Sequence, residues 1–123
     1  KKKRIRTSLF INPSLNDIKM SNELIFYCVE IHTLKWMNLI NSKKNYTNEL
    51  NKIKKCSILA NDISLEVHAG HGLDYKTAQI LSHIKQIKEF NIGHYLIGES
   101  IFYGLDKVIK NFKKIINKKK WKF

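Results

Sequence analysis

The chain opens with alternating apolar and polar positions. Between residues 7 and 11 the two kinds of side chain alternate, and the pattern stops before Pro13. An alternation with a period of two is typical of a β-strand. Ser14 and Asp17 then have the form of a capping box, and apolar positions between Leu15 and Leu24 follow roughly one helical face. The first segment is therefore predicted to be a strand followed by a helix.

The same succession occurs twice more in the middle of the chain. Residues 27–33 and 65–69 alternate as strands do. Residues 34–46 show no clear period, but a Lys-rich helix is predicted from about residue 50 to residue 61. After the second of these strands, apolar side chains at spacings of three predict a helix over residues 75–84.

The C-terminal segment supplies a fourth strand and helix. A brief strand is predicted at residues 90–92, followed by a short helix at 96–102 and a strongly amphipathic helix at 105–116. Alternating strands and helices indicate an α/β fold with parallel strands, either an open doubly wound sheet or a piece of a β/α barrel. Spacing alone does not choose between these two. No repeat or flexible linker indicates a second domain, so residues 1–123 are interpreted as one domain or part of one.

The net charge of +13 suggests a nucleic-acid partner until its distribution is considered. Residues 1–4 and 118–122 carry eight basic side chains and no acidic ones, which leaves 15 basic against 10 acidic residues between them. The ends look like solvated charge runs, because Trp121 is the one aromatic residue that stands between their basic side chains. A small basic nucleic-acid-binding module therefore remains only an alternative, and we expect no nucleic-acid partner.

The lengths of the apolar runs and the spacing of the cysteines indicate whether to expect a membrane span, disulfides or a metal site. The longest apolar run, residues 24–29, is far shorter than the roughly 18 residues of a membrane span. Cys28 and Cys56 have neither C-x-x-C spacing nor a histidine at a ligand interval, so no disulfide framework and no metal site is predicted. We expect a cytoplasmic protein without membrane contact.

The candidate chemistry lies mainly where predicted strands end. All five glycines fall between residues 70 and 104. His71 stands on a turn between Gly70 and Gly72, where its ring would be exposed and could act as a general acid or base. A turn histidine without a role is the plainer alternative.

Two further positions could bind substrate. Gly93 and His94 precede a predicted short helix, whose first backbone amides would attract a phosphate, although a glycine that merely reverses the chain is about equally compatible. Glu30 and His32 share one side of their strand. The Glu30 carboxylate could stabilise positive charge on an amine or iminium, but the pattern slightly favours simple pairing with a basic side chain.

These motifs together resemble one enzyme family. The segments 65–75 (LEVHAGHGLDY), 90–94 (FNIGH) and 97–105 (IGESIFYGL) resemble the end of pyridoxine 5′-phosphate synthase, and segments 8–12 and 29–33 resemble two of its earlier strands. Their order and spacing agree across nearly the whole chain. The combination of AGHGL with NIGH is more specific than either motif alone.

The resemblance implies a fold and a reaction. It implies the C-terminal half of a TIM-type β/α barrel, with strands five to eight. The family condenses 3-amino-1-hydroxyacetone 1-phosphate with 1-deoxy-D-xylulose 5-phosphate to pyridoxine 5′-phosphate, releasing inorganic phosphate and water. No cofactor is implied, the partners are these small phosphorylated substrates, and the full-length protein is expected to be a homo-oligomer.

The resemblance also implies roles for particular residues. His71 would be the proton donor and Glu30 the residue that stabilises the transition state. Gly72, Gly93 and His94 would bind the aminoketone and its phosphate. The sequence departs from the family at residues 34–36 (LKW), where family members usually carry a glycine-containing loop with a tyrosine.

The absent first four strands lead to two further expectations. A half barrel would expose strand edges and apolar faces, so alone it should be unstable, aggregate, or pair with another copy. The isolated chain should also lack synthase activity, since other acid and base groups of the family are missing. A non-catalytic remnant of the enzyme is the corresponding alternative.

Overall fold

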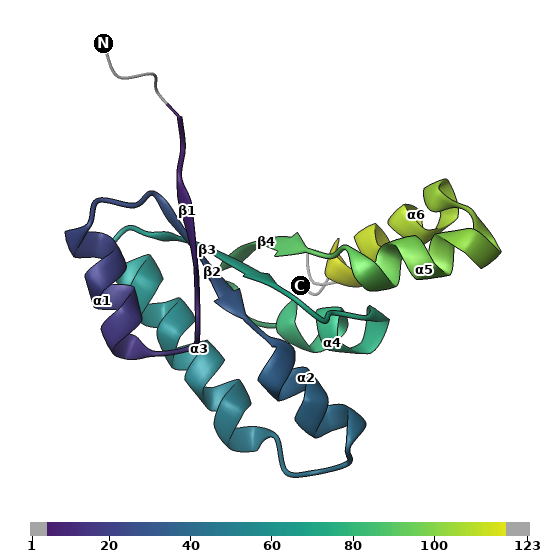
Figure 1. The fold of residues 1–123 in the computed structure, drawn as a ribbon, viewed down its shortest axis with the longest axis horizontal. Coiled ribbons are helices and arrows are strands. Elements are labelled where there is room, and N and C mark those ends of the chain that lie inside the picture. The colour runs from purple at the N-terminus through teal and green to yellow at the C-terminus, as the bar shows by residue number, and fades with distance from the viewer. Residues whose placement is uncertain (1–4, 118–123) are drawn as a thin grey trace, which may run out of the picture.

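Four parallel strands and six helices make up residues 5–117, the part of the chain that the computed structural model describes (Figure 1). In chain order the elements are β1 (Ser8–Ile11), α1 (Leu15–Glu23), β2 (Cys28–His32), α2 (Leu34–Asn41), α3 (Thr47–Asp62), β3 (Glu66–Gly70), α4 (Tyr75–Leu81), β4 (Ile87–Asn91), α5 (His94–Tyr103) and α6 (Leu105–Asn117). The predicted α/β class and its alternating order are confirmed.

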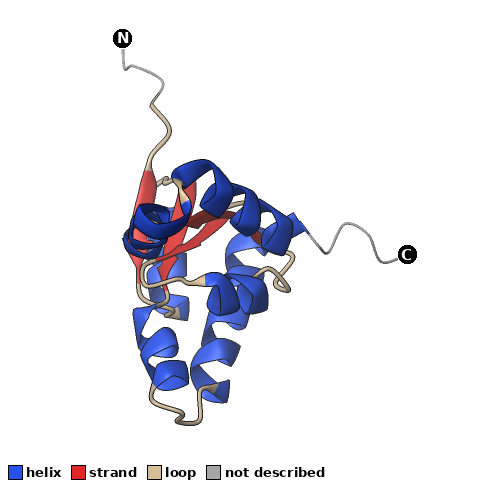
Figure 2. Cartoon of the chain, turned by 90° about the vertical axis from the view of Figure 1, so that its right-hand side faces the viewer, coloured by secondary structure: helices blue, strands red, loops and turns tan. Residues whose placement is uncertain are grey.

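The strands lie in the sheet in the same order as in the chain. The order is β1-β2-β3-β4, all neighbours are parallel, and β1 and β4 form the two edges (Figures 1 and 2). Phe10, Glu30, His68 and Glu89 lie in one row across the sheet, because each is the register partner of the next. The described strands show no reversal of order of the kind that defines a doubly wound sheet.

The main core lies between one face of this sheet and the helices. It joins side chains from all four strands and from α1 to α4, with Ile18, Val29, Ile31, Ile53 and Leu81 among those without solvent exposure. Burying one such side chain stabilises the fold by about 1.5–3 kcal/mol. This face therefore fixes which side of every strand points inward, and it leaves the opposite side of the sheet for the polar residues.

The opposite face of the sheet is mainly polar, so the exposed apolar surface expected of a half barrel lies not there but on helix α5, which buries none of its residues fully. Arg6 pairs with Glu66, whose carboxylate also accepts a 2.9 Å hydrogen bond from His68 Nε2. His68 Nδ1 lies 3.6 Å from Glu89 Oε1. Phe10, 51% exposed, is the large apolar side chain on this face. These contacts therefore give the polar groups on this face of the sheet partners within the chain itself.

Four helices differ from the sequence-based prediction by two residues or more. Helix α3 begins at Thr47 rather than near residue 50, and α4 ends at Leu81 rather than at residue 84. Residues 34–41 form α2 although their sequence shows no clear period, because Trp36 and Ile40 are drawn into the core while the intervening side chains remain partly exposed. Helix α5 begins at His94, two residues earlier than predicted. The chain therefore enters α5 directly from the Gly93 turn.

A strand boundary and a cap also differ. Strand β4 begins at Ile87, because Ile87 and the polar Glu89 pair with β3 on either side of Lys88, where the register shifts, and these polar residues carry no hydrophobic signal. Ser14 does cap α1, accepting a 3.4 Å hydrogen bond from the Asp17 amide. The complete reciprocal capping box, however, is formed by Asp74 and Thr77 at α4.

Helices α5 and α6 form a hairpin beyond the β4 edge (Figure 1). Val108 and Phe112 of α6 form a second apolar cluster with Ala78 of α4. The ring centroids of Tyr75 and Phe112 are 4.5 Å apart. Helix α5 buries none of its residues fully. No helix within residues 5–117 is long and apolar enough to cross a membrane.

Candidate active site

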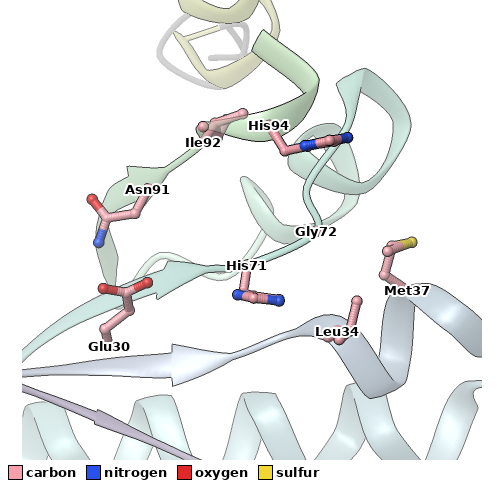
Figure 3. Close-up of a pocket in the computed structure, with 9 residues that line it drawn as sticks. Glu30, Leu34, Met37, His71, Gly72, Asn91, Ile92 and His94 are labelled. Atoms are coloured by element: carbon pink, nitrogen blue, oxygen red, sulfur yellow. The ribbon is translucent and has the colours of Figure 1, made fainter. Parts of the chain in front are cut away.

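A cavity of about 800 Å³ lies where β2, β3 and β4 end (Figure 3). Its volume falls in the range of ligand pockets, roughly 300–1,000 Å³. The lining residues are Glu30, Leu34, Met37, His71, Gly72, Asn91, Ile92, Gly93 and His94. The structure thus gathers all five residues singled out in the sequence, Glu30, His71, Gly72, Gly93 and His94, around one space.

His71 is held in an uncommon backbone conformation. Its φ is +74° and that of Gly72 is +83°, so two consecutive residues occupy the left-handed region. A side chain costs free energy there, and such strain persists only when neighbouring structure enforces it. A Cβ on Gly72 would also lie 2.7 Å from Met37 Cε. Glycine is therefore favoured at position 72 by its backbone conformation, whereas the end of the flexible Met37 side chain could move aside.

Thr33 holds this turn in place through hydrogen bonds to its backbone. Its hydroxyl lies 2.8 Å from the carbonyl oxygens of both Gly70 and His71, and its backbone N–H donates a 3.0 Å hydrogen bond to the Gly70 oxygen. Thr33 is completely buried. The residue after β2 thus anchors the loop after β3, which fixes where the His71 backbone lies relative to Glu30.

The His71 ring packs in an aromatic cluster with Phe10 and His32. The centroids of His71 and His32 are 4.8 Å apart at an interplanar angle of 81°, and those of Phe10 and His32 are 4.9 Å apart. His32 Nδ1 lies 3.4 Å from Asn12 Oδ1, whereas its buried Nε2 has no hydrogen-bond partner within the described residues. This cluster limits the orientations open to His71.

The same surroundings keep His32 uncharged. Burial lowers the pKa of the His32 imidazole below its ordinary 6.5, the neighbouring His71 lowers it further, and the Glu30 carboxylate partly opposes both effects. Near neutral pH His32 is therefore neutral.

Glu30 differs from the other carboxylates of its sheet face. The sequence slightly favoured pairing of Glu30 with a basic side chain, but within residues 5–117 that pairing is made by Glu66, whose pKa is lowered by hydrogen bonds from His68 and Arg6. Within residues 5–117 no basic side chain forms an ion pair with Glu30. Its carboxylate lines the cavity and is available to a cationic group of a ligand.

The opposite wall of the cavity can accept an anion. Gly93 caps α5 and His94 is its first residue, and no side chain caps this helix end. Uncapped amides at the start of a helix attract negative charge. Nothing lies within 4 Å of the position that a Cβ on Gly93 would occupy, so an anion can approach the backbone.

Two residues of this region were not identified from the sequence. Asn91 ends β4 and lines the cavity. Because side chains alternate along a strand, its place next to the core-facing Phe90 could have indicated that it points to the cavity side of the sheet. Thr33 carried no such signal, because its partners are backbone atoms of another strand. Within residues 5–117 no group of three His, Cys, Asp or Glu side chains could hold a metal ion.

Comparisons with known proteins show the family of the chain. The family model of the pyridoxal phosphate biosynthesis protein PdxJ matches residues 1–118. Three curated relatives, each named pyridoxine 5′-phosphate synthase, come from Pelagibacter ubique, Sulfurihydrogenibium sp. and Zymomonas mobilis. They are 62%, 40% and 39% identical over 95%, 94% and 92% of this chain, which correspond to 49%, 47% and 43% of the relatives. The chain spans about half the length of these relatives, and it belongs to the PdxJ family of pyridoxal phosphate biosynthesis proteins.

Proposed function

We propose that this chain is the C-terminal half of a pyridoxine 5′-phosphate synthase and supplies strands five to eight of its β/α barrel. Sequential parallel strands, with helices covering one face and polar side chains on the other, support this architecture. The match to about half of each relative supports it independently. The first four strands would then close the barrel over the polar face.

The proposed reaction condenses 3-amino-1-hydroxyacetone 1-phosphate with 1-deoxy-D-xylulose 5-phosphate, and it releases phosphate and water. The observation that carries this proposal is the meeting of Glu30, His71 and Gly93 at one cavity at the carboxyl ends of three strands. In barrels these ends are where substrates bind. The family's chemistry requires both proton transfer and phosphate binding at such a place.

His71 and Glu30 divide the proposed chemistry between them. His71 donates a proton to a departing oxygen, since its exposed ring stands on the anchored turn beside the cavity. The Glu30 carboxylate stabilises the positive charge that develops on the substrate nitrogen when the amine and a carbonyl form an iminium. Neither step uses a metal or an organic cofactor.

The aminoketone phosphate is proposed to bind at the start of α5. The Gly93 and His94 amides and the His94 ring would contact the phosphate, and Gly72 would contact the same substrate from the His71 loop. The substrate would then span the cavity with its amine toward Glu30. This orientation presents the reacting nitrogen to the carboxylate.

Reconstitution tests the proposal. The purified chain is mixed with a polypeptide carrying the part of the Pelagibacter ubique relative that lies outside the match, both substrates are added, and pyridoxine 5′-phosphate is measured by chromatography. We expect product from the mixture, none from the chain alone, and large losses with His71→Ala or Glu30→Ala. Product from the chain alone would disprove its dependence on the missing half. A mixture that assembles but stays inactive would favour the alternative that the chain is a non-catalytic remnant of the enzyme.

A further inference from the structure

Gly70 is the last residue of β3 and lies directly beside the Glu30 side chain. A Cβ added to Gly70 would lie 2.1 Å from Glu30 Oε1 and 3.0 Å from Asn91 Cβ. The first distance is well inside any van der Waals contact. A side chain at position 70 and the observed position of the Glu30 carboxylate therefore exclude each other.

The backbone of Gly70 does not itself require glycine. Among the glycines of residues 5–117, the positive φ values belong to Gly72 and Gly104, whereas Gly70 lies within a regular parallel pairing opposite His32 and Asn91. Strands disfavour glycine, because it contributes no packing and loses more backbone entropy. The reason for glycine here must therefore lie in what occupies the space beside it.

That space is occupied by Glu30 and Asn91, which point toward each other from either side of β3 (Figure 3). Both line the cavity, and no cation holds Glu30 within the described residues. A carboxylate without a cationic partner has several rotamers open to it. A neighbouring amide that can donate N–H groups limits that freedom.

We propose that Gly70 and Asn91 are positioning residues for Glu30: Gly70 leaves the space through which the carboxylate crosses β3, and Asn91 orients it within the cavity. The inference extends the proposed function and relies on it for the catalytic meaning of Glu30. Its structural content, a coupling between positions 30, 70 and 91, does not depend on any substrate.

A double-mutant cycle measures this coupling on the chain itself. Urea midpoints are compared for Gly70→Ala in the wild-type, Glu30→Ala and Glu30→Gln backgrounds. Glu30→Gln keeps the bulk and should keep the clash, whereas Glu30→Ala removes it. We expect the fall in midpoint caused by Gly70→Ala to shrink by about half or more in the Glu30→Ala background only. Gly98→Ala, where no atom lies within 4 Å, should give the same shift in every background.

A spectroscopic signature separates positioning from general packing. The side-chain amide resonances of Asn91 should move in Glu30→Ala, which removes the carboxylate without adding an atom beside Asn91, and they should stay in place in Gly98→Ala. An equal loss of stability from Gly70→Ala in all backgrounds, or unmoved Asn91 resonances, would overturn the proposal.

Catalysis provides the last comparison. In an active reconstituted mixture, Gly70→Ala should lower kcat by about 100-fold, as expected when a catalytic group is displaced by about 1 Å, with a much smaller change in KM. Unchanged kcat would refute the positioning role. An inactive wild-type mixture would count against the proposed synthase function. The coupling between positions 30, 70 and 91 would then still be decided by the urea and resonance measurements, which need no substrate.

Discussion

Replacing Thr33 by valine tests the anchor beneath the His71 turn. Valine keeps the shape of the side chain and removes the hydroxyl, which lies 2.8 Å from two carbonyl oxygens but has a single proton to donate. The Gly70 oxygen keeps its bond from the Thr33 N–H, and water can reach the exposed His71 residue. The loss is therefore closer to one hydrogen bond than to two, about 1–2 kcal/mol of unfolding free energy.

The assay combines urea denaturation with amide hydrogen exchange of residues 70–72. Thr33→Val should lower the unfolding free energy by that amount and should speed exchange in the turn more than in the rest of β3. Thr33→Ser is the matched control, because it keeps the hydroxyl and loses only a methyl group. If Thr33→Val changed neither stability nor exchange, or if the serine variant loosened the turn equally, the anchoring argument would be refuted.

Three more predictions concern other parts of the chain. Phe112→Ala should cost about 3–5 kcal/mol and release α6 from α4, as measured by urea unfolding and helix-specific exchange, because the ring is almost fully buried. Glu49 has a pKa lowered chiefly by its hydrogen bond with Lys52, so the stability it contributes is present above its ordinary pKa of 4.5 and lost as the pH falls through the lowered value. Denaturation from pH 7 to pH 3 should therefore show a larger acid-side loss in the wild type than in Glu49→Gln. Gly104→Ala should destabilise by about 1 kcal/mol in thermal melts, because its φ is +83°.

Local patterns in the sequence determined the class of the fold and much of the site. Period-two alternation located the first three strands, because the covered face of the sheet requires an apolar residue at every second position. Glycines at the ends of strands marked the loops of His71 and His94, and the positive φ of Gly72 gives the physical reason for one of them. Several of the residues that meet at the cavity, such as Glu30, His71 and Gly93, could therefore be singled out from the sequence, whereas Asn91 was not.

Tertiary structure decided what depends on contacts between distant segments. Helix α2 and the start of β4 form because of core packing and backbone pairing with β3, neither of which leaves a periodic signal. The sequence also could not decide whether Glu30 or Glu66 would pair with a cation, because Arg6 reaches Glu66 only once β1, β2 and β3 lie side by side. Thr33 gained its role in the same way, since both carbonyl groups beside its hydroxyl belong to another strand and its loop. A pattern along the chain specifies which way a side chain faces, whereas its partners are specified only when the strands are brought together.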